Sequence, residues 1–305
     1  MSLELIKDCK YISSVGMLLS LDDMGIINYH KEPSQITHDF SKLLNGKDGD
    51  CIYIKFAFFR QFIHQIFPRI NYKFILITGD GDETMPDNMI DFQLFNSFIN
   101  SNKIIHWYSV NCNEHYHDKL SLIPIGVNFH SLSFGEFCGW SEKSMTPLEQ
   151  EEMLDEIKNN SKVFYERTPS CYSNFHFVTH SEFGNPRQDA INKIPKDLIY
   201  YEPNLVSRKD TWSKNVEFAF TVSPMGHGMD CHRTWEALML GGVVIVKKSQ
   251  LDSLYEDLPV LIVNDWDEIT QELLNTTLLS FKNKTFNYDK LTLKYWINKI
   301  KNTKI

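Results

Sequence analysis

FAFTVSPMGHGMDCHRTWEALMLGGVVIV, residues 218–246, has the pattern of a strand, a glycine-containing loop, a helix and a second strand. The apolar run 218–222 is closed by a serine and a proline, which is typical of the end of a buried strand. Helical periodicity covers 231–240, with Asp230 as the expected N-cap and Gly241 in the pair of glycines that stops the helix. The stretch therefore predicts an α/β unit with a buried parallel sheet.

The loop within this stretch predicts an anion site. Gly226 and Gly228 allow the backbone to turn and leave room for a ligand to approach closely. The first-turn amides of the helix that follows are unpaired, and the helix dipole is positive at that end. A phosphate group is therefore the first ligand to consider.

The alternation of strands and helices continues on both sides of this stretch. Apolar runs predict buried strands at 51–55, 74–78, 103–110, 120–125, 174–179, 198–201 and 260–263. Helical periodicity predicts helices at 58–67 and 89–100, and an amphipathic one at 288–301. The first 50 residues fit only an opening strand-helix unit. This order of elements is typical of parallel sheets with helices on both faces.

An acidic helix begun by Thr146 and Pro147 divides these elements into two groups. We expect an α/β fold of two Rossmann-like domains, with parallel sheets that face a central cleft. The expected domains are 1–145 and 171–305, joined by the connection 146–170, with the terminal helix packing back on the first domain. Ligands of such sheets bind outside the carboxyl ends of the strands.

Composition excludes several classes of function. The 305 residues carry 31 basic and 39 acidic side chains, and a net charge of −8 without a basic patch argues against a nucleic-acid partner. The N-terminal segment lacks the basic start and cleavage site of a signal peptide, and no run reaches about 18 apolar residues. The six cysteines lack C-x-x-C spacing, which fits reduced thiols. We therefore expect a soluble cytoplasmic protein with no membrane anchor.

Arg233 and Glu236 share one face near the start of the 231–240 helix, because they are three residues apart. An arginine suits a diphosphate, and a glutamate can accept hydrogen bonds from both hydroxyls of a ribose. The pair therefore indicates a nucleotide site. The alternative is an exposed ion pair on a surface helix. The glycine loop before the pair and the apolar strand after it favour the nucleotide.

SPMGHGMDCHRTWEALMLGGVVIV resembles the signature of the exostosin-like glycosyltransferases, in which a serine-proline, a glycine loop, an Asp, a His-Arg pair and Trp-Glu-Ala-Leu precede a glycine and a buried strand. KFILITGDGDETMP, IIHWYSVNCN, IPIGVNFHS and NFHFVTHSEFGNPR resemble further blocks of small members, in the same order, over roughly Tyr72 to Trp266. His227 stands where the family often has Asn, and His180 replaces the usual Asn after Thr179. The resemblance implies a GT-B architecture and glycosyl transfer that needs no bound metal.

The resemblance also implies a donor site in the second domain. Arg233 would contact the diphosphate, Glu236 the ribose, and the backbone of 226–228 the phosphates. Arg187 matches a second arginine of the family, and two arginines at a helix N-terminus can stabilise the charge that grows as the glycosidic bond breaks. The other donor-side candidates belong to the glycine loop or the helix start: Ser223, Gly226, His227, Gly228, Asp230 and His232. Acceptor-side candidates come from the first domain: Asn111, Asn128 and Trp107.

Displacement at the anomeric carbon requires a base that removes the proton of the acceptor hydroxyl. Asp82 is the first candidate, because it matches the aspartate of the family block after the 74–78 strand. Asp80 and Glu83 are its competitors. Alternatively, the two aspartates only build an acidic turn. A D-x-D triplet also holds a metal in the other main transferase architecture, but the rest of the chain argues against that interpretation.

Histidines provide a possible metal site. His115 with His117, or His227 with Asp230 and His232, could act as ligands. Neither set has an obvious further ligand, and histidines that alternate in a polar loop are usually solvated. We therefore expect no metal.

Aromatic residues could hold the acceptor. Trp107, Tyr108 and Trp140 could offer a ring face to a sugar, and the alternative is that they pack in the core.

The leading hypothesis is an inverting, metal-independent glycosyltransferase that uses no cofactor. It would transfer a hexosyl or pentosyl group from a nucleotide sugar, UDP-linked, to a sugar hydroxyl of a glycan or glycoprotein. Anchorless exostosin-like chains are similar to those of large DNA viruses and microbes, which implies a cytoplasmic location, in the host if the chain is virus-encoded. Two alternatives remain. One is a nucleotide-sugar or glycan-binding module that has lost the base, and the other is a metal-dependent hydrolase.

Overall fold

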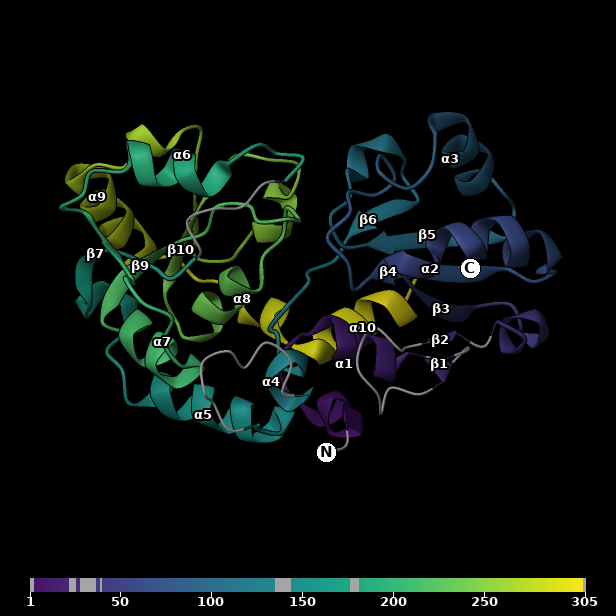
Figure 1. Cartoon of the computed structure of the whole chain (residues 1–305), viewed down its shortest axis with the longest axis horizontal. Helices are drawn as coiled ribbons and strands as arrows, with labels where there is room; N and C mark the ends of the chain where they lie inside the picture. The colour runs from purple at the N-terminus through teal and green to yellow at the C-terminus, as the bar shows by residue number, and fades with distance from the viewer. Residues whose placement is uncertain are drawn as a thin grey trace.

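The chain folds into two α/β units that lie side by side (Figure 1). Each unit has a sheet of parallel strands with helices packed beside it, so the expected α/β fold with two Rossmann-like sheets is confirmed. The structure is a computed structural model. It describes residues 3–21, 26–27, 37–38, 40–134, 144–175 and 181–303.

The first sheet has four parallel strands in the order β3-β4-β5-β6. Their bounds are β3 Asp50–Lys55, β4 Phe74–Gly79, β5 Ile104–Ser109 and β6 Leu120–Leu122. Every residue of β3 and β4 is buried, because this sheet is covered on both faces.

Consecutive side chains of β5 identify what covers each face. Trp107 stacks on Phe59 of α2 (Phe56–Gln61), with ring centroids 5.3 Å apart. Tyr108 points to the opposite face, as strand geometry requires. Its hydroxyl lies 2.9 Å from the hydroxyl of Thr303, just beyond α10 (Leu293–Lys301). The last helix of the chain therefore packs on the first unit.

The second sheet has five parallel strands in the order β11-β10-β9-β7-β8. Their bounds are β7 Thr168–Ser173, β8 Ile199–Tyr201, β9 Phe218–Val222, β10 Val243–Lys247 and β11 Val260–Val263. The chain adds β8 on one side of β7 and then returns to build β9, β10 and β11 on the other side. The loops after β7 and β9 therefore diverge at a switch point, which is where open α/β sheets bind ligands.

Helices and short segments complete the two units. The α-helices are α1 Ser14–Ser20, α2, α3 Phe92–Ile99, α4 His130–Phe134, α5 Pro147–Asn159, α6 Pro186–Lys193, α7 Arg208–Asn215, α8 His232–Met239, α9 Gln271–Lys282 and α10. The short segments are η1 Leu3–Asp8, η3 Lys42–Asn45, the π-turn η4 Phe62–Ile66, η5 Phe67–Arg69, η6 Glu114–Tyr116, η7 Phe164–Glu166, η8 Asp252–Tyr255, η9 Trp266–Glu268 and η10 Tyr288–Leu291. Strands β1 Ile26–Ile27 and β2 Thr37–His38 form a separate antiparallel pair. No helix of the described ranges is long and apolar enough to span a membrane.

Most of the predicted strands are present, and those at 218–222 and 260–263 have the predicted bounds. The strand predicted at 174–179 is wrong at its start, because β7 occupies Thr168–Ser173 instead. The two exposed residues at its beginning, Thr168 and Pro169, hid this strand from a search for apolar runs. Residues 176–180 of the prediction lie outside the described part of the chain.

The predicted terminal helix is divided in two. Thr292 interrupts it between η10 and α10, and its hydroxyl accepts a hydrogen bond from the amide of Tyr295 as the N-cap of α10. The predicted opening strand is reduced to isolated bridges, in which Tyr11 pairs with Thr292 and Ser13 with Gly126. The opening segment therefore takes its partners from distant parts of the chain.

Helix α5 contacts both units. Thr146 and Glu149 form a capping box at its start, which confirms the predicted N-terminus. The Glu151 carboxylate accepts hydrogen bonds from the amides of Lys10 and Tyr11 at 3.0 and 2.9 Å. On the side of the second unit, Gln150 accepts a hydrogen bond from Arg208 at the start of α7.

Candidate functional site

The carboxyl ends of the two sheets meet at the glycine loop that follows β9. A Cβ atom added to Gly228 would lie 2.8 Å from Nδ2 of Asn111 and 3.0 Å from the main-chain oxygen of Asp82. Real Cβ atoms do not approach other heavy atoms so closely, so glycine is needed here for the contact between the units. The loop after β9 thus lies directly against the loops after β4 and β5.

Asn111 ties these loops together. Its Oδ1 accepts a 2.8 Å hydrogen bond from the amide of Asp230, and its Nδ2 donates to the main-chain oxygen of Asp82 at 3.4 Å. The residue is fully buried and has φ of 51°, a left-handed conformation that asparagine tolerates better than most residues. Its side chain therefore holds the two units together, whereas the sequence suggested a contact with the acceptor.

Asp230 is not the N-cap of α8. The helix begins at His232 with Cys231 as N-cap, and the Asp230 carboxylate instead accepts hydrogen bonds from the amide of Ile125 at 2.8 Å and the indole of Trp235 at 2.9 Å. The carboxylate is buried, and a buried polar group needs hydrogen-bond partners, which these two donors provide. Burial raises the pKa of Asp230 to about 6.

The acidic turn after β4 contains one paired aspartate and two exposed acidic side chains. Asp80 lies in the left-handed region at φ of 58°, and its Oδ2 is 2.7 Å from Nζ of Lys55 at the end of β3. Burial alone would raise the pKa of Asp80, but the charge and hydrogen bond of Lys55, together with the nearby His130 and His232, outweigh it and the pKa is lowered. Asp82 and Glu83 are exposed. Asp80 is therefore held in an ion pair, whereas the carboxylates of Asp82 and Glu83 are open to solvent.

Two histidines lie beside this turn. His130 follows the loop after β6, and its ring centroid is 6.0 Å from that of His232 at the start of α8. Burial lowers the pKa of His130 to about 4, so its imidazole is neutral at pH 7. His232 is held by its Nδ1, which lies 2.7 Å from the main-chain oxygen of Gly126. Burial lowers the pKa of His232 as well.

Sequence reasoning missed Lys55 and His130. Lys55 pairs with Gly79 in the β3–β4 register, which brings it beside Asp80. The signal available in the sequence was a lysine that directly follows the apolar run 51–54. His130 lies in the quoted block IPIGVNFHS, but nothing in the sequence indicated that it would face the acidic turn.

Two arginines meet at the other side of the glycine loop. Arg187 lies in the first turn of α6, and a Cβ atom on Gly226 would be 3.0 Å from its Nη2. Burial and the neighbouring Arg233 lower the pKa of Arg187 to about 10, so it stays charged at pH 7. Arg233 donates to the main-chain oxygen of Pro224 at 2.7 Å. The pair concentrates positive charge at the switch point of the second sheet.

The remaining donor-side candidates differ in exposure. The Glu236 carboxylate is half-buried and accepts a 3.2 Å hydrogen bond from the indole of Trp212. The Ser223 hydroxyl lies 2.8 Å from that of Thr234. The His227 side chain is exposed at the tip of the glycine loop.

A cavity of about 300 Å³ lies within the second unit, and it does not coincide with the predicted site. Ser223 and Thr234 line it, but Arg187, Arg233 and Glu236 do not. Two lysines line it: Lys247 is paired with two carboxylates, and Lys248 is exposed.

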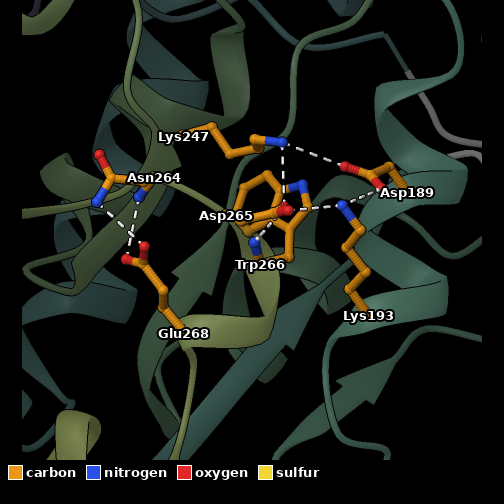
Figure 2. Close-up of polar contacts among 7 residues, drawn as sticks. All are labelled: Asp189, Lys193, Lys247, Asn264, Asp265, Trp266 and Glu268. Carbon is orange, nitrogen blue, oxygen red and sulfur yellow. Dashed lines mark hydrogen bonds and ion pairs between the residues drawn. The ribbon is translucent and has the colours of Figure 1, made fainter.

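Figure 2 shows that ion-pair network, in which Lys247 Nζ lies 3.3 Å from Asp189 Oδ2 and 3.2 Å from Asp265 Oδ1. Lys193 Nζ contacts the same two aspartates at 3.0 and 2.7 Å. Lys193 and Lys247 thus balance the two aspartates, and the exposed Lys248 is the further positive charge that the cavity offers to a diphosphate. The two arginines at the glycine loop remain the better anion site.

The candidates for contact with the acceptor are mostly buried or already hydrogen-bonded within the protein. Trp107 is fully buried, and its indole donates to Thr78 Oγ1 at 2.9 Å, so it has no ring face open to a sugar. Tyr108 is also buried. Trp140 and His180 lie outside the described residues. The Asn128 side chain accepts a 3.1 Å hydrogen bond from the amide of Ser131, which places it at the start of α4.

The described ranges contain no group of three or more His, Cys, Asp or Glu side chains arranged to hold a metal ion. Of the histidines considered as ligands, His115 is exposed and His117 Nδ1 accepts from the amide of Lys119 at 3.0 Å.

No protein-family model matches the chain, and no curated protein sequence matches it. Similar solved structures include the trehalose-6-phosphate structure from E. coli bound with UDP-2-fluoro glucose, at 11% identity over 86% of this chain and 76% of that chain, with a TM-score of 0.41. The OtsA apo structure gives 11% identity over 86% and 73%, with a TM-score of 0.42. Sucrose-phosphate synthase from Thermosynechococcus elongatus gives 10% over 92% and 82%, with a TM-score of 0.39. Values this low carry no conclusion about the site or the reaction.

Proposed function

We propose that this chain is an exostosin-like glycosyltransferase that moves a monosaccharide from a UDP-sugar to a sugar hydroxyl of a glycan or glycoprotein. The observation that carries the proposal is the contact between the glycine loop of the second unit and the acidic turn of the first. This contact brings an anion site and exposed carboxylates together where the loops of the two units meet at Gly228, Asn111 and Asp82, which we call the seam. Residues 1–145 would supply the acceptor side and residues 171–305 the donor side, with 146–170 as their connection.

The donor diphosphate would lie against the glycine loop. Arg187 and Arg233 would neutralise it, with backbone amides of 226–228 as further donors. Glu236 would accept hydrogen bonds from the ribose hydroxyls, because its carboxylate is half-buried on the same helix as Arg233. The arginines provide positive charge where the leaving group develops negative charge, so the proposed reaction needs no bound metal and no cofactor.

The proposed reaction is a single displacement with inversion. The acceptor oxygen forms a bond to the anomeric carbon while the bond from that carbon to the diphosphate oxygen breaks, and the nucleoside diphosphate leaves with the electron pair. A carboxylate takes the proton of the acceptor hydroxyl. We assign this role to Asp82, whose side chain is exposed beside Gly228, with Glu83 as its nearest competitor.

Asp80 is better suited to positioning than to proton transfer. Its carboxylate is paired with Lys55, and the pKa of Asp80 is lowered by that charge, which makes it a weaker base. The ion pair would hold the turn in the conformation that presents Asp82.

The test is calorimetric titration with UDP, and a donor screen that measures UDP release, both in the presence of a chelator. We expect UDP to bind and one UDP-sugar to be consumed when a glycan acceptor is added. Binding without turnover over a broad set of donors and acceptors would favour a nucleotide-sugar-binding module. A protein that binds no nucleotide and no nucleotide sugar would contradict the proposal.

A further inference from the structure

A second cavity, of about 420 Å³, lies at the far end of α8 from the candidate site. It is lined by residues 158–159 at the end of α5, by residues 161–165 and Arg167, by Leu240 with Gly241, and by Tyr288. Helix α8 starts with His232 at the seam and ends at Met239, so its length separates this cavity from the proposed donor site. None of the proposed catalytic or donor residues lines it.

Three cations line this cavity: Lys158, Lys162 and Arg167. In the described part of the chain, none of them forms an ion pair with a carboxylate, and no acidic side chain lines the cavity. Burial and nearby positive charge lower the pKa of Lys158. The cavity therefore holds positive charge that the protein leaves unbalanced.

Arg167 is the buried cation of this wall. Only 6% of the residue is exposed, and two of its three nitrogens are satisfied. Nε donates to the main-chain oxygen of Lys162 at 2.8 Å, and Nη2 donates to Leu240 O at 2.8 Å and Ser161 Oγ at 3.0 Å. Its Nη1 is buried without a hydrogen-bond partner among the described residues. Nη1 has no surface open to the cavity, so Arg167 contributes positive charge to the wall rather than a free donor.

Capping of α8 explains only part of this arrangement. The contact of Nη2 with Leu240 O satisfies a terminal carbonyl of the helix, which accounts for one face of the guanidinium. It does not account for Nη1 or for the two lysines.

The rest of the cavity wall is apolar or aromatic. Phe164 is buried, whereas Tyr165 and Tyr288 are exposed by 36% and 43% at the rim. Aromatic faces of this kind pack against rings, and lysine and arginine bind phosphate and carboxylate groups. The two features together fit an anion attached to a ring.

We propose that this cavity is a second binding site, for a small organic anion in which a phosphate or carboxylate is carried on a ring, such as a phosphorylated or acidic sugar. The anionic group accepts hydrogen bonds from Lys158 and Lys162, Arg167 adds positive charge to the wall, and the ring packs on the aromatic rim. The site does not depend on the proposed transfer reaction.

Calorimetric titration of the full chain with glucose 6-phosphate, glucuronate, inorganic phosphate and glucose tests this inference. The titrations use the Arg233→Gln variant, so that the donor site does not contribute. We expect one equivalent of glucose 6-phosphate or glucuronate to bind, at least about tenfold more tightly than phosphate or glucose. The stronger of the two identifies which anionic group the site prefers.

Lys158→Gln and Lys162→Gln should each weaken this binding by about tenfold, because each removes one charged donor. Both leave Arg167 and its helix contact in place, and an unchanged thermal midpoint verifies the fold. Lys209→Gln, an exposed cation on α7, is the matched control and should have no effect. The inference is overturned if neither ring anion binds, if glucose binds equally well, or if both lysine variants bind like the control.

Discussion

The amide of Asp230, in the second unit, donates a 2.8 Å hydrogen bond to Oδ1 of Asn111, at the end of β5 in the first. The same Asn111 side chain reaches the main-chain oxygen of Asp82. One buried amide group thus connects the loop proposed to bind the diphosphate with the turn proposed to supply the base. Changes at this residue should affect both the stability of the seam and the chemistry that depends on it.

Asn111→Gly and Asn111→Ala separate the two contributions of this residue. Both variants lose the side-chain hydrogen bonds, which should lower the free energy of unfolding by about 2 kcal/mol. Alanine must in addition adopt φ of 51°, which costs about 1 kcal/mol more than it does for glycine. Urea denaturation measures both values. A glycine variant that is less stable than the alanine variant would contradict this account.

Arg233→Gln should weaken UDP binding about tenfold or more, because it removes a charge-assisted contact to the diphosphate. The fold should be retained, since Arg233 is half-buried and donates its hydrogen bonds to Ser223 and Pro224 of its own loop. Calorimetric titration with UDP measures the change, and the Lys209→Gln protein is the control of equal charge. Equal loss of affinity in both proteins would point to a general charge effect rather than a contact.

Asp82→Asn should reduce turnover by about 10²-fold or more while UDP affinity is unchanged, because the amide cannot accept the proton. UDP release and UDP titration on the same protein provide the two readouts. The comparison with Asp80→Asn is informative, because that change leaves Lys55 buried without its partner and should destabilise the fold by about 3 kcal/mol. Full activity of Asp82→Asn would transfer the base role to Glu83 or Asp80.

The buried carboxyl of Asp230 should make the folded protein less stable as pH rises from about 4 to 6. Its pKa is raised from 3.8 to about 6, so in this window the folded state binds more protons than the unfolded state. At about 1.4 kcal/mol for each pH unit, the cost reaches about 3 kcal/mol. Denaturation of wild type and Asp230→Asn at pH 4 and pH 7 should reveal this difference in slope. Parallel pH profiles would show that the carboxyl does not titrate in this range.

The two loop glycines should respond differently to alanine. At Gly228 the added methyl meets Asn111 and the backbone of Asp82, so the units must shift, at a cost of about 1–3 kcal/mol of stability and with loss of transfer. At Gly226 it meets only the end of the Arg187 side chain, which can move. That variant should keep its stability and lose UDP affinity. Thermal unfolding and UDP titration distinguish the two results.

Local patterns in the sequence were sufficient for β9, β10, β11 and the glycine loop, although not for β7. The β9 strand is a continuous apolar run, and the loop and helix after it carry glycines at positions where the backbone requires them. These features depend on neighbours in the chain, so a reader of the sequence can find them. The same reasoning assigned Asp230 to the helix cap, because a cap is the usual role of an aspartate at that place.

Long-range contacts explain the errors. Asp230 is bonded to Ile125, which lies 105 residues earlier, and Lys55 reaches Asp80 only through the register of neighbouring strands. Trp107 looked available for a sugar, but its burial depends on helices whose packing the sequence does not specify. Such long-range contacts determine whether a polar side chain is free to bind a ligand or instead joins the two units.

The two structural units do not correspond to two consecutive halves of the polypeptide chain. Leu293, Trp296 and Ile300 of α10 are buried, and the segment before that helix pairs with Tyr11 beside the first sheet. The first half of the molecule is therefore assembled from both ends of the polypeptide. A single cut between the halves would deprive the first of its covering helix α10, so the first half cannot be cloned intact as one continuous piece. A circular permutant that joins the end of α10 to the start of η1 would make each half contiguous.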